Sequence, residues 1–363
     1  MKKEINNVFQ ILRNIKTVAK SKKSSYKKIR IAFKWLAYFI GSCILLIIAI
    51  LLFFRIQAMF REKNTRHDAA PKTGRFVHAN DIEMFIQEMG PVDGPAVVFT
   101  HGFGAWSGMW QESMSTLSQA GFHTIAIDMP PFGFSERPVD NTYSRQDQAK
   151  RIIGLLDTLQ IKKAILVGHS YGGRSTMEAV FSNPKRFSAL VLVNVALDFD
   201  TTPSDTRLRD AAFSIPPVRS MIVASALTNP LLTQKLLESF VYDPTVWTPE
   251  RVVIYQQPLG LKNSTNDLGE WLVRDMFALS TPAASNTESS YQKLDIPVLI
   301  IWGDKDTVTP LPQGEHIARL IPHAEFVVLP NVGHIPQIEN VQGFNNAILP
   351  FLIGSSVESV SNR

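Results

Sequence analysis

The residues able to do covalent chemistry stand directly after short apolar runs. One such run, KAILV at 163–167, is followed by Gly168-His169-Ser170-Tyr171-Gly172, a G-x-S-x-G pattern. Small residues at both ends of this pattern permit the strained strand-to-helix turn that raises a serine hydroxyl above a sheet, with the backbone N–H of Tyr171 pointing toward the same space. The pattern predicts that Ser170 is a nucleophile. Taken alone, it also fits a serine at a helix N-cap.

A serine needs a base to remove its proton and a third group to orient that base. Of the eight histidines, only His334 follows the last apolar run, so it alone fits the chain order Ser, Asp, His of a nucleophile-elbow hydrolase. We predict that His334 is the base. His169 precedes the serine and should point to the opposite face, and His101 lies in an early loop.

The acid should lie between serine and histidine in the chain, at the end of a neighbouring strand. Trp302-Gly303-Asp304-Lys305-Asp306 offers two carboxylates after the run PVLII. Asp304 is close enough to the strand end to cap the turn. Asp306 lies deeper in the loop, where it can reach the histidine, so we predict Asp306 as the acid and keep Asp198 in reserve.

An acyl-transfer site also needs backbone donors for a developing oxyanion. After the run PAVVFT the chain reads His101-Gly102-Phe103-Gly104. This stretch also fits an ordinary glycine turn without a catalytic role. Gly102 allows a sharp turn, after which the N–H of Phe103 can join that of Tyr171. We predict that these two amides form the oxyanion hole.

The elements that must position these residues alternate between strands and helices. Unalternating, β-branched runs are typical of strands buried on both faces, and repeated βα units predict a mostly parallel sheet. An antiparallel edge pair is expected at 75–78 and 82–88, turned at Asn80-Asp81. The other expected strands are 95–102, 123–130, 163–170, 189–196, 297–304 and 324–331, and the expected helices are 107–119, 144–159, 171–183, 312–320 and 337–352.

The regular alternation stops at 197–292, a helical stretch punctuated by prolines. We predict that it is a cap over the carboxyl ends of the strands, where such sheets bind ligands. The core is then 75–196 with 293–354, and 355–363 is a flexible end. Four cap aromatics are assigned to a substrate pocket, with ordinary cap packing as the alternative: Phe240, Trp247, Trp271 and Phe277.

Charge divides the chain into two parts. Residues 1–66 contain 15 Lys or Arg and 2 Asp or Glu, a net +13, and the remaining residues contain 22 and 30, a net −8. A nucleic-acid partner would require a basic folded body, so the charge argues against one. The single cysteine, Cys43, excludes an intrachain disulfide and a Cys-cluster metal site, and no metal or cofactor is implied.

An uncharged run of 20 residues, 35–54, is long enough to cross the ~30 Å hydrocarbon core as a helix. It exceeds the apolar region of a cleaved signal peptide, the rival interpretation. Eight Lys or Arg lie in 15–34 and five in 55–74, which favours a cytoplasmic N-terminus and an exoplasmic body. We therefore expect a basic tail at 1–34, a transmembrane helix and a polar stalk at 55–74.

Residues 75–352 resemble an α/β-hydrolase of the lid-bearing esterase, lipase and haloperoxidase-like group. The resemblance implies an eight-stranded, mostly parallel sheet flanked by helices, with a helical cap. It also places the nucleophile on Ser170, the acid on Asp306 and the base on His334. Pro131 departs from the usual glycine of the family pattern, which bears on the loop near Asp128. The motifs are HGFG (101–104), DMPPFGFSERP (128–138), GHSYGG (168–173), WGDKD (302–306) and GHIPQIE (333–339).

This resemblance implies acyl transfer to water through an acyl-serine. With the expected anchor and cap, it favours a membrane-bound hydrolase of hydrophobic or lipid-like carboxylic esters, whose partners are the ester and the lipid bilayer. Two alternatives remain. One is a carbon–carbon bond hydrolase of ring-cleavage products, which uses the same triad. The other is a catalytically dead receptor or scaffold.

Overall fold

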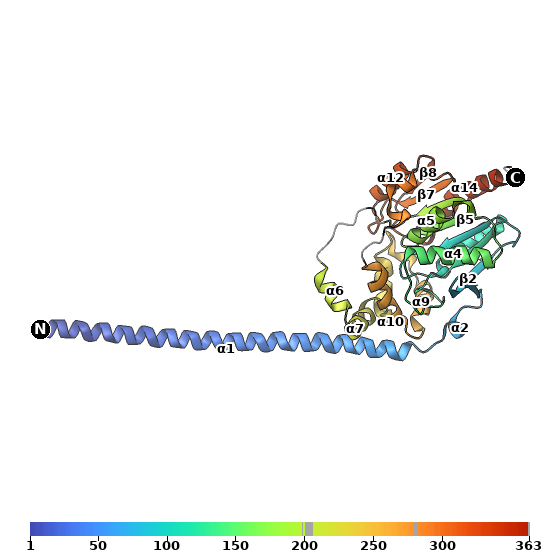
Figure 1. Cartoon of the computed structure of the whole chain (residues 1–363). Coiled ribbons are helices and arrows are strands. Elements are labelled where there is room, and N and C mark those ends of the chain that lie inside the picture. The colour runs from blue at the N-terminus through green and yellow to red at the C-terminus, as the bar shows by residue number, and fades with distance from the viewer. Residues whose placement is uncertain (198, 200–205, 279–281, 362–363) are drawn as a thin grey trace. The chain divides into compact units, whose positions relative to one another are not determined.

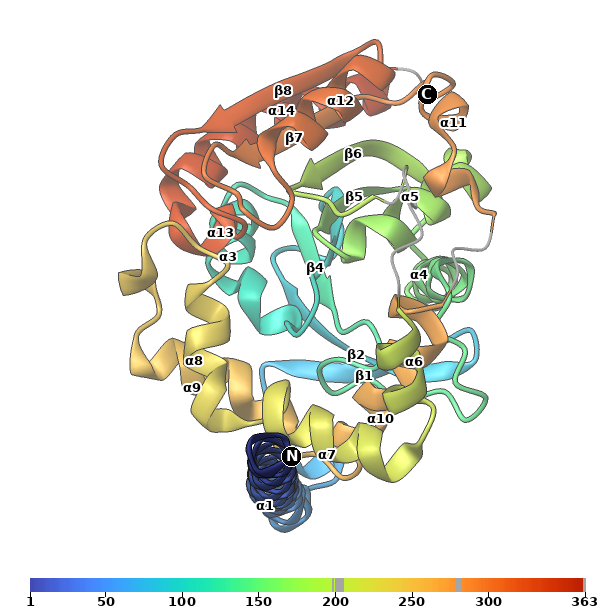
Figure 2. The ribbon, with the colours of Figure 1, turned by 90° about the vertical axis from the view of Figure 1, so that its left-hand side faces the viewer.

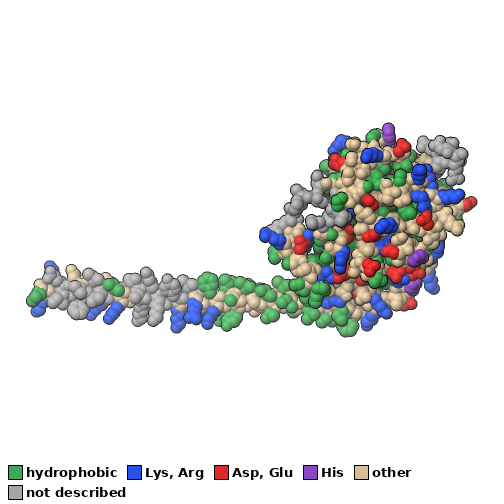
Figure 3. Space-filling model, viewed as in Figure 1, with side chains coloured by type: hydrophobic (Ala, Val, Ile, Leu, Met, Phe, Trp, Pro, Cys, Tyr) green, Lys and Arg blue, Asp and Glu red, His purple; other side chains and the backbone are tan. Residues whose placement is uncertain are grey.

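The computed structural model describes residues 1–197, 199, 206–278 and 282–361 (Figure 1). The chain divides into two compact units, Met1–Phe54 and Arg55–Arg363. The first unit is most of helix α1 (Lys2–Arg61). Within this helix, Arg30–Arg61 is long and apolar enough to cross a membrane, a property that a signal sequence near an N-terminus shares. Figure 3 shows its apolar side chains exposed along the helix.

The second unit is built on one eight-stranded sheet of order β1-β2-β4-β3-β5-β6-β7-β8. β2 pairs antiparallel with β1 and with β4, and the other neighbours pair parallel. The predicted mostly parallel, eight-stranded sheet is thereby confirmed. The strands are β1 (Gly74–Ala79), β2 (Ile82–Met89), β3 (Ala96–Thr100), β4 (His123–Ile127), β5 (Ala164–His169), β6 (Phe187–Val193), β7 (Val298–Gly303) and β8 (Ala324–Leu329).

Helices cover both faces of the sheet (Figure 2). Successive strand residues point to opposite faces, so Val98 packs in one apolar cluster and Val97 in the other. One cluster joins the sheet to α4 (Arg145–Thr158), α5 (Gly172–Ser182) and α12 (Leu311–Leu320). The other joins it to α3 (Gln111–Gln119) and α14 (Val341–Ser361). The strands between them are buried on both faces, as their unalternating sequences predict.

The chain between β6 and β7 forms the cap. Its helical turns place apolar residues against the sheet's carboxyl edge and against one another, as the clusters that contain Leu237, Trp247 and Trp271 show. The cap helices are α6 (Arg207–Phe213), α7 (Pro216–Ala226), α8 (Pro230–Glu238), α9 (Pro249–Gln256), α10 (Ser264–Trp271) and α11 (Glu288–Tyr291). A one-turn π-helix, η5 (Leu272–Met276), directly extends α10.

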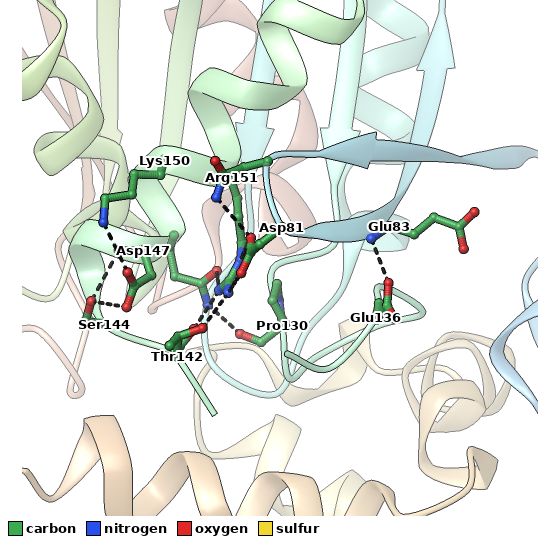
Figure 4. Close-up of polar contacts among 11 residues, drawn as sticks. Asp81, Glu83, Pro130, Glu136, Thr142, Ser144, Asp147, Lys150 and Arg151 are labelled. Atoms are coloured by element: carbon green, nitrogen blue, oxygen red, sulfur yellow. Dashed lines mark hydrogen bonds and ion pairs between the residues drawn. The ribbon is translucent and has the colours of Figure 1, made fainter. Parts of the chain in front are cut away.

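Helix α4 holds the loop that follows β4. The buried guanidinium of Arg151 donates to both carboxylate oxygens of Asp81, at 2.9 and 2.6 Å, and to the carbonyl of Thr142 at 2.7 Å (Figure 4). Gln148, on the same helix, donates to the carbonyl of Pro130 at 2.6 Å. These bonds tie the β1–β2 turn and the loop with the unusual Pro131 to one helix.

Residues 55–74 differ from the expected polar stalk. Helix α1 continues to Arg61, and α2 (Arg66–Ala69) precedes β1. Asn64 forms an isolated parallel bridge with Leu261 of the cap: its N–H donates to the carbonyl of Gly260 at 3.2 Å, and its carbonyl accepts from Lys262 at 3.0 Å. Backbone polar groups at this helix end are thus satisfied by the cap, and the segment belongs to the body.

The C-terminal end also differs from expectation. Helix α14 runs to Ser361, through most of the segment expected to be flexible. Ser355 is buried, and its hydroxyl donates to the carbonyl of Phe351 at 2.9 Å. The helical pattern therefore continues beyond the last residues that the sequence assigned to the core.

Candidate active site

Ser170 stands on a strained turn between β5 and α5. Its φ of +50° is unusual for a residue with a side chain. Its N–H donates to the carbonyl of Val193 at 3.0 Å, and its carbonyl accepts from Gly173 and Ala196 at 3.0 Å. A Cβ on Gly172 would lie 2.4 Å from the carbonyl oxygen of His101. The close approach of the two loops therefore requires glycine beside this serine.

The three residues predicted as a triad meet at the carboxyl edge of the sheet. Nε2 of His334 lies 2.7 Å from the Ser170 hydroxyl, and Nδ1 of the same ring lies 2.8 Å from a carboxylate oxygen of Asp306. All three side chains are buried. The arrangement has the geometry of a nucleophile, a base and an orienting acid.

Asp306 is held by four further donors. One of its oxygens accepts from the backbone N–H groups of Val308 and Thr309, at 2.7 and 2.9 Å. The other accepts from the Asn194 amide at 2.5 Å and the Thr309 hydroxyl at 2.6 Å. Burial raises the pKa of Asp306, but the hydrogen bonds and the charge of His334 outweigh it, and the net pKa is lowered. This carboxylate is therefore charged at neutral pH.

Sequence reasoning missed Asn194 and Thr309. The only available signal for Asn194 was its place at the end of β6, between the strands that lead to Ser170 and Asp306. Asp304, the other carboxylate of its loop, faces away from the triad: it accepts from the Val332 N–H at 3.3 Å and pairs with Lys305 at 3.1 Å. Asp198, the reserve acid, lies outside the described residues.

The two amides predicted as an oxyanion hole flank the nucleophile. Tyr171 follows Ser170 and precedes α5, and Gly102, before Phe103, is so close that its Cβ would lie 2.9 Å from the Ser170 Cβ. Within the described part of the chain, neither the Phe103 nor the Tyr171 N–H donates to another protein group. Both amides are thus available to an oxygen beside Ser170.

Two other histidines are buried near the triad. The ring of His101 accepts the N–H of Met129 at Nε2 (2.9 Å), so its Nδ1–H donates to the carbonyl of Gly102 (2.8 Å). His169 was expected to point away from the serine. Its Nε2–H instead donates to the carbonyl of His334 at 2.8 Å. Burial lowers the pKa of His101 to about 4, and burial with the nearby His334 lowers that of His169 to about 3.

We expect folding stability to fall as the pH is lowered from 7 to 5. Both imidazoles take up a proton near pH 6.5 in the unfolded chain but only near pH 4 and 3 in the folded one, so the unfolded state binds more protons in this window. Well above pH 6.5 both rings are neutral in the folded and the unfolded state, so the shifts cost no stability, whereas at pH 5 the free energy of unfolding is lower by about 2 kcal/mol per histidine. Thermal melts at the two pH values measure this loss.

The matched variants for these melts are His169→Gln and His323→Gln. Glutamine at 169 can keep a donor for the His334 carbonyl and does not titrate, so it should weaken the pH dependence. His323 is exposed, and its replacement should leave the dependence as in the wild type. A melting temperature that stays constant from pH 7 to 5 would contradict the linkage.

A cavity that opens to solvent lies over Ser170, with a volume of about 800 Å³ when its open part is included. Its wall is mostly apolar and includes Leu237 and Phe240 from the cap, with Arg174 as a cation. Arg174 lies 3.5 Å from the carboxylate of Asp275 in η5. The charge of this cation is therefore matched by a carboxylate beside it.

A second cavity adjoins the first and shares five lining residues with it. Its own apolar residues include Leu236, Leu259 and Leu268 of the cap, and its cation, Arg137, lies 3.6 Å from Asp267. The shared residues are Phe103, Ala105, Leu237, Phe240 and Tyr255. The two cavities together offer an extended, largely apolar space that begins at the nucleophile.

The four aromatics assigned to a substrate pocket lie in different places. Phe240 lines both cavities, and its ring lies 6.0 Å from that of His334. Trp271 is buried behind the lining, where it contacts Phe103 and Tyr171. Trp247 packs on Tyr255, and Phe277 packs on Phe213, within the cap.

The model of the family described as alpha/beta hydrolase fold matches residues 95–341. A 2-hydroxy-6-oxononadienedioate/2-hydroxy-6-oxononatrienedioate hydrolase of Paraburkholderia phymatum is 30% identical over 70% of this chain and 86% of that protein. A 2-hydroxymuconate semialdehyde hydrolase of Pseudomonas sp. strain CF600 is 28% identical over 80% of this chain and 98% of that protein.

Solved structures of hydrolases are also similar to this chain. A meta-cleavage product hydrolase, CumD, from Pseudomonas fluorescens IP01 has a TM-score of 0.62 and 25% identity, over 78% of this chain and 98% of its own. These relatives correspond to the carbon–carbon alternative of the sequence analysis better than to ester hydrolysis. The family model, which covers most of the chain, and the sheet with its strand-to-helix turn at Ser170 lead to one conclusion: the chain belongs to the alpha/beta hydrolase fold family.

Proposed function

We propose that the protein is a serine hydrolase that cleaves carboxylic esters of hydrophobic acyl groups. The observation that carries the proposal is the hydrogen-bonded chain Ser170–His334–Asp306 at the start of a largely apolar cavity. An intact chain of this kind is also the reason to prefer an enzyme to a catalytically dead scaffold.

The reaction follows from the positions of these atoms. The Ser170 hydroxyl attacks the ester carbonyl carbon while Nε2 of His334 takes its proton, and the charged Asp306 stabilises the imidazolium. The Phe103 and Tyr171 amides donate to the oxyanion. The C–O bond to the alcohol then breaks, and His334 returns the proton to the leaving alcohol. Water, deprotonated by His334, attacks the acyl carbon, the bond from this carbon to the Ser170 oxygen breaks, and His334 gives its proton back to that oxygen as the free acid leaves.

The lining of the two cavities supports a hydrophobic acyl group. Burying each methylene group against apolar side chains contributes about 0.8 kcal/mol. The two cations of the cavity walls, Arg174 and Arg137, each lie beside a carboxylate, Asp275 and Asp267. A neutral, apolar chain requires no further charge partner in such a space.

Carbon–carbon bond hydrolysis is the second candidate, and the named relatives favour it. The relative at 30% identity acts, by its name, on a dioate, which carries two carboxylates. A dianion needs cationic partners when it leaves water. Among the described residues that line the cavity over Ser170, the cation is Arg174, which is already beside Asp275. This charge balance is the reason to place ester hydrolysis first.

A substrate panel separates the two candidates. We expect kcat/KM for p-nitrophenyl esters to rise from acetate to hexanoate by up to roughly four-fold per methylene, from the burial of each CH₂. We expect 2-hydroxy-6-oxononadienedioate, the dianion, to be cleaved much more slowly. Leu236→Asn, which places an amide in the second cavity only, should flatten the chain-length dependence and leave acetate turnover unchanged. Faster cleavage of the dioate would make the carbon–carbon reaction the function.

We also propose that residues 35–54 anchor the protein in a membrane, with the body on the exoplasmic side. Two observations support this proposal. The apolar stretch of α1 is exposed, and more basic residues lie before the span than after it. Protease added to intact cells should digest the body, and the N-terminal tail should be cleaved only after permeabilisation. A body protected in intact cells would reverse the orientation. A body released from washed membranes would argue for a cleaved signal sequence.

A further inference from the structure

We propose that Glu62, in the segment that follows the apolar helix stretch, is a positioning residue for the oxyanion hole and acts through cap helix α10. The proposal rests on the function proposed above, because it assigns the Phe103 and Tyr171 amides to the oxyanion. The sequence suggested only a stalk here. The described contacts show instead that Glu62 holds the first turn of the short helix α10. The last residue of this helix contacts both Phe103 and Tyr171.

The first turn of α10 is fixed by the residues at the end of α1. The Glu62 side chain is nearly inaccessible, with 5% of its surface exposed. Its carboxylate accepts from the N–H of Thr265 at 3.3 Å and from the Thr265 hydroxyl. Thr265 is fully buried. Beside this contact, Arg61 donates to the carbonyl of Leu259 at 3.0 Å, so the segment is fastened at several points to the chain that leads into α10.

The last residue of α10, Trp271, contacts both predicted oxyanion residues. Its indole N–H donates to the Tyr171 hydroxyl at 3.0 Å. Its ring stacks on that of Phe103, with centroids 5.6 Å apart and planes 26° apart. The Tyr171 hydroxyl in turn donates to Asp275 at 2.5 Å, in the π-helix that continues α10. Trp271 has no exposed surface, so its position is set by these contacts.

The two contacts lie at opposite ends of one short helix, and this helix couples them mechanically. Trp271 lies six positions after Thr265, which is about 9 Å along a helix. In this proposal α10 moves as one body. Removal of the buried carboxylate leaves the Thr265 N–H without its described acceptor, and the Thr265 hydroxyl keeps only the Thr228 hydroxyl, 2.8 Å away, as a partner. Displacement of Trp271 shifts both amide-bearing residues. A small misplacement of catalytic groups can cost up to roughly 100-fold in rate.

The test uses the full-length protein in detergent and four variants: Glu62→Ala, Glu62→Gln, Trp271→Phe and the double variant Glu62→Ala/Trp271→Phe. Two quantities are measured. One is kcat and KM for p-nitrophenyl acetate per active site, counted by fluorophosphonate titration. The other is the second-order rate of fluorophosphonate labelling, which uses the same oxyanion donors and does not depend on which substrate is natural.

We expect Glu62→Ala to lower kcat and the labelling rate by about 10-fold, part of the loss that a missing oxyanion donor causes, with KM within about two-fold. Glu62→Gln keeps an acceptor for Thr265 and should restore most of both rates. Trp271→Phe keeps a ring against Phe103 but loses the bond to Tyr171. The double variant should lose less than the product of the two single losses, because both act on one coupled element.

A matched control uses Asp157→Asn, an exposed residue of α4 that pairs with Arg186, alone and combined with Trp271→Phe. The fold-losses in rate of Asp157→Asn and Trp271→Phe should multiply in their double variant. If Glu62→Ala lowers only the melting temperature and the titrated fraction, with unchanged rates per site, the segment is merely structural and the proposal is wrong. The proposal is also wrong if the fold-losses in rate of Glu62→Ala and Trp271→Phe multiply in the double variant. Absence of any Ser170 labelling in the wild type would instead overturn the proposed function.

Discussion

Ser170→Ala is expected to abolish fluorophosphonate labelling and to lower kcat for ester hydrolysis by roughly 10⁶-fold. The alanine lacks the oxygen that His334 activates at 2.7 Å, so no acyl-serine can form. The oxyanion amides and the cavity remain and should support only weak residual hydrolysis. Labelling is read on a gel, and kcat is measured with p-nitrophenyl esters.

Ser175→Ala is the matched control for this change. Ser175 is buried on α5, and its hydroxyl donates to the carbonyl of Gly172 at 3.1 Å. It lies near the nucleophile in sequence but has no contact with the imidazole of His334 among its described hydrogen bonds. It should label at the wild-type rate. Labelling that survives in Ser170→Ala and disappears in Ser175→Ala would show that the nucleophile is misassigned.

Asp306→Asn is expected to lower kcat by up to roughly 10⁴-fold while the fold is kept. The carboxylate accepts the Nδ1–H of His334 at 2.8 Å and thereby directs the ring's lone pair at Ser170. An asparagine removes the negative charge that stabilises the imidazolium. Its NH₂ group is a donor, unlike a carboxylate oxygen. In the place of that oxygen it would face the Asn194 amide and the Thr309 hydroxyl, which also donate to this position.

Asp304→Asn is the control for the acid. Its carboxylate is partly exposed and contacts Lys305 and the Val332 N–H rather than the triad. We expect a change in kcat of less than about ten-fold, with any effect appearing mainly as a lower melting temperature. A larger loss of kcat in Asp304→Asn than in Asp306→Asn would reverse the assignment of the acid.

The amino-acid sequence was enough to predict the sheet and to propose which strand ends carry the candidate catalytic residues. Strands buried on both faces are uniformly apolar, so runs such as 163–167 are visible without any tertiary information. In a parallel sheet all carboxyl ends meet at one edge. The residues after such runs, Ser170, Asp306 and His334, are therefore brought together by topology alone, and glycines mark the turn that needs them.

The hydrogen-bond partners that hold these residues could not be predicted from the sequence, because they come from distant parts of the chain. Asn194 reaches Asp306 across 112 residues, and His169 reaches the carbonyl of His334 across 165. Neither has a local pattern, since an asparagine after a strand and a histidine before a serine fit many environments. The register between neighbouring strand ends decides which polar groups meet.

The segment 55–74 shows the same limit most clearly. Its place after an apolar helix predicts a polar stalk, whereas the fold buries the Glu62 side chain against Thr265, 203 residues away. A charged side chain is expected to face water unless a partner compensates its burial. The partner here becomes adjacent only when the cap has folded, so composition and periodicity predict the elements, and long-range packing determines which of them touch the site.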